Sequence, residues 1–265
     1  MPEAMARGVR LHYQRLGPTG ARTRIAFVHG LVVDNLASWY FSVACAAATF
    51  ADVLLYDLRG HGLSERPKDG YRIDDMVGDL AALLDETLGS DPVHLVGNSF
   101  GALLALQFAR RYPERVAGLV LVDGHLGNDG FAERMARTLS LRGEEADRAI
   151  ARTFEHWPGR TSPRKRAKLV EQARSLVLGT TLVEDLRATD ALGPRDFARI
   201  GAPTLALYGE HSDIVGESAP LLASMPRCRV DVLAGCTHSV LWEATDDVRD
   251  RAFAFCRGER DGRAA

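Results

Sequence analysis

Residues 93–109 read VHLVGNSFGALLALQFA, and this stretch decides the fold. A short apolar strand at residues 93–96 leads directly into Gly-x-Ser-x-Gly at residues 97–101, and an almost wholly apolar helix follows. A strand–turn–helix of this kind is typical of a nucleophile elbow, in which a serine occupies a strained turn and small neighbours let the chain segments approach. We therefore predict that Ser99 is a nucleophile at a helix N-terminus, where the helix dipole favours developing negative charge.

Short apolar runs alternate with helical patterns on both sides of this stretch, which predicts a mostly parallel central sheet flanked by helices. The strand-like runs lie at residues 9–16, 24–28, 53–56, 93–96, 116–122, 204–208 and 229–233. Residues 125–199 contain helical stripes and no convincing strand, so we predict a helical cap there. The expected organisation is a core at 1–124 and 200–257, a cap at 125–199 and a flexible tail at 258–265.

A serine hydroxyl becomes nucleophilic near neutral pH only with a base, and the base needs an orienting acid. His238 lies in the loop after the last predicted strand, and Asp213 lies in the loop after the penultimate one. Both loops leave the end of a parallel sheet at which the Ser99 turn lies, where ligands bind in open α/β folds. We predict a catalytic triad of Ser99, Asp213 and His238, with Asp123 as the main rival for the acid.

Five segments with these features recur in the order found in the α/β-hydrolase superfamily, which the chain resembles over nearly all of its length. They are His29-Gly30, residues 57–64 (DLRGHGLS), the elbow, residues 209–213 (GEHSD) and His238. The resemblance implies the α/β-hydrolase fold and an oxyanion hole formed by the backbone N–H groups of Leu31 and Phe100. A serine at the elbow separates the chain from relatives of this fold that use aspartate or cysteine there.

Two shorter resemblances bear on the substrate. Residues 31–40 (LVVDNLASWY) resemble thioesterase-like hydrolases of bacterial polyketide pathways, whereas Asn98 resembles the G-N-S-x-G of some C–C bond hydrolases. We therefore expect a serine hydrolase that cleaves an acyl ester or thioester of a small-molecule acyl substrate through an acyl-enzyme, with a polyketide-type thioesterase as its narrower form. The alternatives are a C–C bond hydrolase of a diketone-type substrate and a non-catalytic small-molecule receptor of the same fold.

Four residues are candidates for substrate contact: Asp34, Asn35, Trp39 and Trp157. Asp34 and Asn35, near the oxyanion loop, could polarise a substrate hydroxyl or cap the helix that follows. The cap offers aromatic and aliphatic side chains, Trp157 among them, as walls for an apolar acyl chain. A basic run, Arg160, Arg164, Lys165, Arg166 and Lys168, is either a solvated helix face or a docking patch for an acidic acyl carrier protein.

Composition narrows the class of protein further. The 265 residues carry a net charge of −2, which argues against nucleic acid or an anionic membrane as a main partner. The first residues lack the apolar segment of a secretory signal. The four cysteines are scattered, without the spacing of a zinc site or a disulfide framework. We expect a cytoplasmic enzyme with no metal and no cofactor, whose oligomeric state the sequence leaves open.

Overall fold

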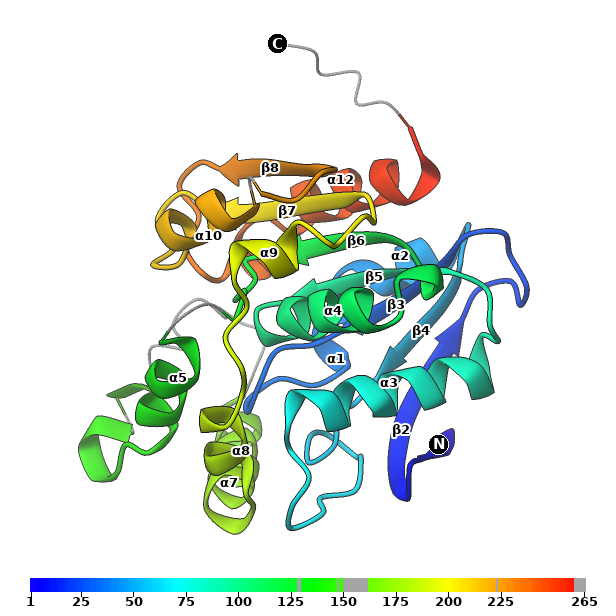
Figure 1. Ribbon diagram of the computed structural model, residues 1–265. Helices are drawn as coiled ribbons and strands as arrows, with labels where there is room; N and C mark the ends of the chain where they lie inside the picture. The colour runs from blue at the N-terminus through cyan, green and yellow to red at the C-terminus, as the bar shows by residue number, and fades with distance from the viewer. Residues whose placement is uncertain (128–129, 147, 150–161, 223, 260–265) are drawn as a thin grey trace.

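The computed structural model describes residues 1–127, 130–146, 148–149, 162–222 and 224–259 (Figure 1). The strands within these residues form one sheet in the order β1-β2-β4-β3-β5-β6-β7-β8. Their bounds are β1 Glu3–Ala6, β2 Val9–Leu16, β3 Arg24–Val28, β4 Asp52–Tyr56, β5 Val93–Asn98, β6 Val116–Val122, β7 Thr204–Gly209 and β8 Cys228–Leu233.

The pairs β1–β2 and β2–β4 are antiparallel, and all pairs from β4 through β3 to β8 are parallel. The prediction of a mostly parallel sheet flanked by helices is confirmed. The short strand β1 was not predicted, because four residues that alternate between exposed and buried give too weak a pattern. The parallel register pairs Val28 with Gly97 and Asn98 with Val122, so the ends of β3, β5 and β6 lie at one edge.

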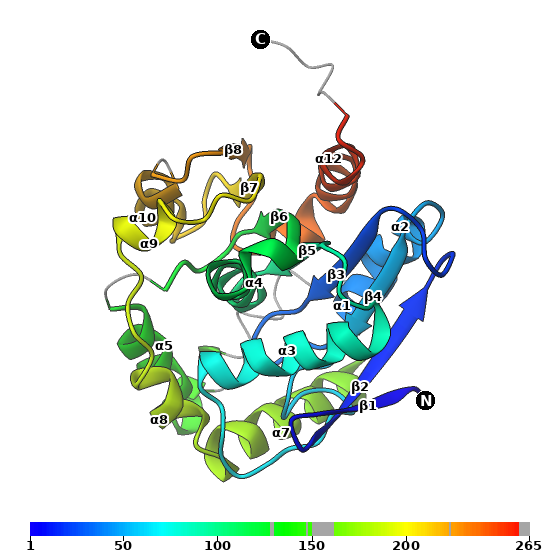
Figure 2. The same cartoon turned by 45° about the vertical axis from the view of Figure 1, so that its right-hand side comes forward.

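Helices cover both faces of the sheet (Figure 2). Their bounds are α1 Ala37–Trp39, η1 Tyr40–Ala44, α2 Cys45–Ala47, α3 Ile73–Thr87, α4 Phe100–Arg111, η2 Pro113–Arg115, α5 Phe131–Leu139, α7 Pro163–Gly179, α8 Leu182–Arg187, α9 Pro194–Phe197, α10 Val215–Leu222, α11 Val240–Glu243 and α12 Thr245–Arg257. Side chains of α3 and α4 build the core on one face, and those of η1 and α12 build it on the other. Every residue of α4 from Phe100 to Ala109 is buried, which explains its almost wholly apolar sequence.

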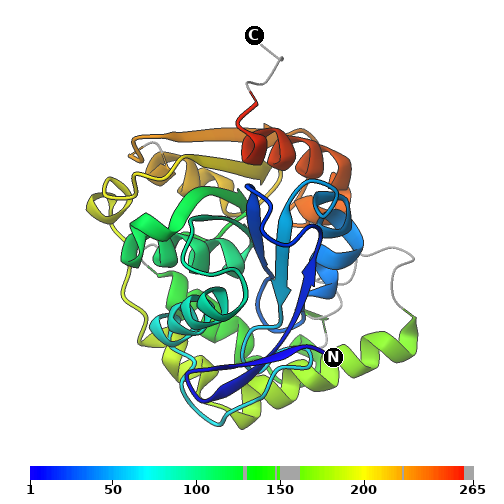
Figure 3. The ribbon, with the colours of Figure 1, turned by 90° about the vertical axis from the view of Figure 1, so that its right-hand side faces the viewer.

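Within the described residues between β6 and β7, the structure has the helices α5, α7, α8 and α9. In Figure 3, α7 runs along the bottom of the molecule and α12 lies at the top. Two hydrogen bonds tie this segment to the loop before α3, from Thr181 N to Lys68 O at 2.9 Å and from Tyr71 N to Asp185 Oδ2 at 2.8 Å. Because α9 contacts α10 and Phe197 is buried in the core, the last helix of the segment packs against the body.

Residues 260–265 of the predicted tail lie outside the described part of the chain. None of the described helices combines the length and the apolar composition that crossing a bilayer requires.

Candidate active site

The Ser99 turn has the backbone geometry of a nucleophile elbow. Ser99 lies between β5 and α4 with φ 53° and ψ −115°, in a region that residues other than glycine rarely adopt. A Cβ at Gly97 would lie 2.4 Å from the carbonyl oxygen of Gly101, and one at Gly101 would lie 2.2 Å from that of Val28. Only glycine fits at these two positions, and the close packing around them presents the Ser99 side chain at the edge of the sheet.

His238 lies in the turn between β8 and α11, beside Ser99. Its Nε2 is 3.1 Å from Ser99 Oγ, and its Nδ1 is 2.5 Å from Asp123 Oδ2. Because the Asp123 carboxylate accepts a hydrogen bond from Nδ1–H, the neutral ring carries its free electron pair at Nε2, facing the hydroxyl. The three groups therefore form a Ser–His–Asp relay.

The expectation that Asp213 pairs with His238 is wrong in this structure. Asp123 follows β6, the strand adjacent to β5, and is fully buried with φ 43°. Its carboxylate also accepts hydrogen bonds from Gly209 N at 2.9 Å and from Ser212 Oγ at 2.6 Å. Asp213 lies one strand further from Ser99 and makes no hydrogen bond to His238 among the interactions of the described residues.

The loop that carries His238 reaches Asp123 by folding closely over the end of β7. A Cβ at Gly209 would lie 2.3 Å from the carbonyl oxygen of Thr237, so a larger residue would push this loop away. The amide of His211 also donates to the Cys236 carbonyl at 2.8 Å. The glycine at the end of β7 thus permits the approach that brings His238 over Asp123.

The electrostatics of the relay suit proton transfer. Burial by itself lowers the pKa of His238, but the hydrogen bond and charge of Asp123, with the charge of Asp213, outweigh it and raise that pKa above its usual value. The neighbouring His125 ring lies 5.5 Å from the His238 ring. Burial, with the His238 charge as a smaller cause, lowers the pKa of His125 to about 3, so His125 stays neutral beside the base.

The loop after β3 and the start of α4 carry the two backbone N–H groups that are predicted to bind the oxyanion. The backbone N–H groups of Leu31 and Phe100 donate to no other group in the described part of the chain. Val32 has φ 71°, a strained value for a β-branched residue, and its N–H donates to His61 Nε2 at 2.8 Å. Burial lowers the pKa of His61 to about 3, and its Nδ1 donates to Arg59 O, so this ring remains a neutral acceptor that holds the loop.

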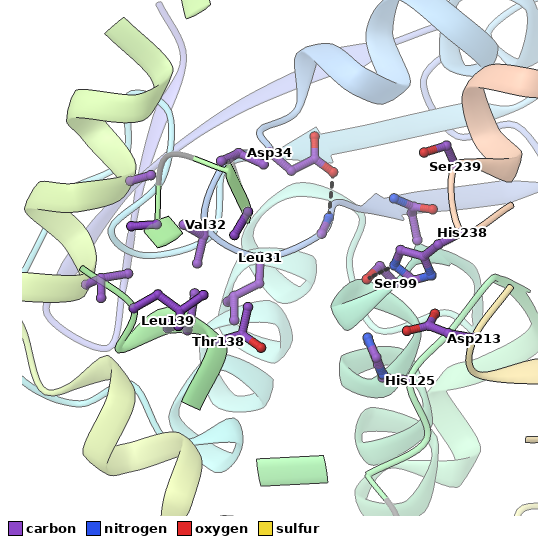
Figure 4. Close-up of a pocket in the computed structure, with 18 of the residues that line it drawn as sticks. Leu31, Val32, Asp34, Ser99, His125, Thr138, Leu139, Asp213, His238 and Ser239 are labelled. Carbon is purple, nitrogen blue, oxygen red and sulfur yellow. Dashed lines mark hydrogen bonds between the residues drawn. The ribbon is translucent and has the colours of Figure 1, made fainter. Parts of the chain in front are cut away.

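A cavity of about 930 Å³ opens in front of Ser99 (Figure 4). The body contributes mainly residues from the loops at the ends of the strands: Gly30, Leu31, Val32, Val33, Asp34, Asn98, Ser99, His211, Asp213, Thr237, His238, Ser239, Leu241 and Trp242. The segment between β6 and β7 contributes a more apolar wall: His125, Thr138, Leu139, Leu141, Arg142, Gly143, Ala146, Ala149, Ala173, Arg174, Val177 and Leu178. The relay therefore lies beside a pocket that is lined both by the loops at the ends of the strands and by the segment between β6 and β7.

Comparison with known proteins identifies the family of the chain. Residues 23–187 match the model of a protein family described as alpha/beta hydrolase fold. The chain belongs to this family. The match includes β3, the elbow and Asp123, and it ends before β7 and β8.

Relatives of this alpha/beta hydrolase carry varied names. The chain is 31% identical over 252 residues to the dihydrolipoyllysine-residue acetyltransferase component of an acetoin cleaving system from Cupriavidus necator, covering 91% of this chain and 64% of that longer protein. It is 28% identical over 272 residues to the putative carbamate hydrolase RutD of Azorhizobium caulinodans, covering 98% of this chain and all of that one. The enol-lactonase from Burkholderia xenovorans LB400 has a similar fold, with a TM-score of 0.76 at 24% identity, over 97% of this chain and 100% of the other.

Of the two residues near the oxyanion loop that were predicted to contact substrate, one lines the pocket and the other does not. Asp34 lines the pocket, but its carboxylate accepts from Gly30 N at 2.8 Å, from Asn35 N at 2.9 Å and from the Ser38 hydroxyl. Asn35 does not line the pocket, and its side chain accepts from Ala37 N at 3.0 Å. The capping alternative therefore describes Asn35, and Asp34 braces the oxyanion loop.

The prediction that Trp39 contacts substrate is wrong. Its side chain is fully buried in the core, where Nε1 donates to Val28 O at 3.0 Å and the ring packs against Phe27 with centroids 5.0 Å apart. Trp39 packs against the sheet, and it is not among the residues that line the pocket. Trp157 lies outside the described residues.

Two residues at this candidate site are not among the predicted ones. Ser212 supports the acid, and Trp242 lines the pocket from α11. The signal for Ser212 is its place beside the end of β7, where a hydroxyl can reach the end of β6. Among the described residues, no group of three or more His, Cys, Asp or Glu is placed to hold a metal ion.

Proposed function

We propose that the chain is a serine hydrolase that cleaves an acyl ester or thioester through an acyl-enzyme intermediate. One observation carries the proposal: Ser99 Oγ, His238 and Asp123 form a continuous relay, with separations of 3.1 and 2.5 Å, at the end of a large pocket. Hydroxyl, base and orienting acid in hydrogen-bond contact are the requirements for acyl transfer by serine.

The chemistry follows from these positions. Ser99 Oγ attacks the substrate carbonyl as its proton passes to His238 Nε2, and the N–H groups of Leu31 and Phe100 stabilise the oxyanion. His238 then protonates the departing alcohol or thiol, which leaves Ser99 acylated. A water molecule deprotonated by His238 attacks the acyl-enzyme, and collapse of the second tetrahedral intermediate releases the acid and restores Ser99.

The shape of the pocket supports a bulky apolar acyl group over acetyl. The cavity of about 930 Å³ is far larger than an acetyl group requires, and its cap side carries Leu139, Leu141, Val177 and Leu178. Burial of each additional methylene contributes about 0.8 kcal/mol, so kcat/KM should rise with chain length until the pocket is filled.

A polyketide-type thioesterase is the narrower form of the proposal, with an acidic acyl carrier protein as partner in the cytoplasm. In the basic run, Arg164 and Lys168 lie exposed on α7 without an acidic partner among the described residues, which supports a docking role. Arg160 and the side chains of Lys165 and Arg166 lie outside the described part of the structure.

The test combines a variant, a label and a substrate series. Ser99→Ala should fold and lose about 10⁵- to 10⁶-fold in kcat, and a serine-directed phosphonate should label wild type at Ser99 alone. Ser239→Ala, a matched change at another pocket serine, should still be labelled. Full activity in Ser99→Ala, or labelling at another residue, would contradict the proposal.

The substrate series compares acetyl, hexanoyl and longer acyl thioesters with a vinylogous 1,5-diketone. A rise of kcat/KM with acyl length is expected, and a flat or falling series argues against an acyl-length pocket. Efficient cleavage of the diketone's C–C bond would instead identify a C–C bond hydrolase. A stoichiometric burst without turnover on any of these substrates would identify a receptor.

A further inference from the structure

Asp213 is a carboxylate that makes no hydrogen bond to the relay, although its charge helps to raise the pKa of His238. It lines the pocket, and its side chain points toward the group formed by Ser99, His238 and His125 (Figure 4). It is exposed, and it forms no hydrogen bond or ion pair with any residue that the structure describes. The place of the orienting acid is already taken by Asp123, so Asp213 is available to a ligand.

The other carboxylate of the pocket differs in this respect. Asp34 is buried, and both of its oxygens accept hydrogen bonds within its own loop. Asp213 therefore has unfilled acceptor capacity at the reacting end of the pocket, where Asp34 has little. Because Asp213 is exposed, water solvates its carboxylate, and a substrate group that donates a hydrogen bond can replace that water.

The charges that line the pocket favour a neutral donor over a cation. The residues that line the pocket include two carboxylates, Asp34 and Asp213, and two guanidinium groups, Arg142 and Arg174, so the lining does not carry an excess of acidic side chains that would select an ammonium group. A hydroxyl can donate to Asp213 without paying the desolvation penalty of a cation.

We propose that Asp213 binds a hydroxyl group that the substrate carries close to its reacting carbonyl, and so selects hydroxylated acyl substrates. This inference rests on the proposed hydrolase function. A hydrogen bond to a charged group is worth enough to change kcat/KM by about 10- to 100-fold. Asp213 acts in this role by contact with the substrate, while Asp123 acts by orienting His238.

Matched substrate pairs test the proposal, each differing by one hydroxyl. One pair is the N-acetylcysteamine thioesters of 3-hydroxyhexanoic and hexanoic acid, with the hydroxyl on the acyl side. The other is 2-hydroxyethyl hexanoate and ethyl hexanoate, with the hydroxyl on the leaving side. Wild type should prefer the hydroxylated member of one pair by about tenfold or more in kcat/KM, and the pair that responds shows on which side the hydroxyl lies.

Asp213→Ala should bring that ratio to about 1, and Asp213→Asn, which keeps a neutral acceptor, should give an intermediate ratio. Glu210→Gln is the control, because it removes a charge from the same loop while keeping an acceptor for Gly235 N; it should retain the preference. A wild-type ratio near 1 in both pairs, a ratio unchanged in Asp213→Ala, or an equal loss for both members of a pair would overturn the inference. Those outcomes leave Ser99-dependent turnover intact, whereas failure of the hydrolase proposal would remove turnover of all four compounds.

Discussion

The loops after β6 and β7 each present an aspartate near His238, and the two aspartates have opposite surroundings. Asp123 is fully buried and accepts hydrogen bonds from Gly209 N, Ser212 Oγ and His238 Nδ1. Asp213 is exposed on the pocket wall and accepts none from the described residues. A carboxylate held on three sides can fix the orientation of an imidazole, whereas one that faces the pocket is available to substrate.

Replacing each aspartate by asparagine tests most directly which of the two orients His238. Asp123→Asn should lower kcat by about 10⁴-fold, because the amide favours the wrong tautomer of His238. Asp213→Asn should lower kcat on an unhydroxylated ester by tenfold at most. Steady-state kinetics at a pH where His238 is neutral measure both effects. The reverse ranking would assign the orienting acid to Asp213.

Removing a support of the buried acid should have a smaller effect. Ser212→Ala deletes a hydrogen bond of 2.6 Å to Asp123 Oδ2, so the carboxylate is held less firmly, and kcat should fall about tenfold with KM little changed. Ser224→Ala is the matched control, because its hydroxyl donates only to the Leu221 carbonyl of its own turn. Equal kinetics for the two variants would show that Ser212 does not position the acid.

The smallest expected effect is a shift in the pH dependence of kcat/KM. Activity requires neutral His238 and should fall as the pH drops through the pKa of that ring. Because Asp123 and Asp213 raise this pKa, the acid limb of kcat/KM in wild type should have its midpoint above the usual value of about 6.5. Asp213→Asn removes one negative charge and should move the midpoint to lower pH. A midpoint that stays in place would mean that Asp213 does not act on His238.

Several features follow from local sequence and were predicted. The run from Val93 to Ala109 predicts a strand, a strained turn and a buried helix, because the apolar pattern and the two glycines act within a few residues of each other. Among the eight histidines, the sequence favours His238 as the base because its loop follows the last strand and leaves the sheet at the catalytic end. Strand order is enough for such a choice, since parallel strands end at the same edge.

Other features depend on contacts between distant segments, and there the predictions were wrong. Trp39 is in a segment near the oxyanion loop, but the packing of its helix against β3 directs the indole into the core. The order Ser–Asp–His is the same with Asp123 as with Asp213, so chain order could not separate the two acids. Asp123 and Asp213 each follow a strand that ends at the catalytic edge, so the strand pattern fits either of them as the acid.

The sequence by itself determined the parallel sheet, the elbow at Ser99 and the loop that carries the base, because apolar periodicity and the positions of glycines act locally. Only the tertiary structure decided which aspartate is the acid. That choice depends on the loop of His238 folding closely over Gly209 and on the burial of Asp123 among three donors. The hydrogen bonds to Asp123 join residues that are 86 to 115 positions apart, and no local pattern encodes such contacts.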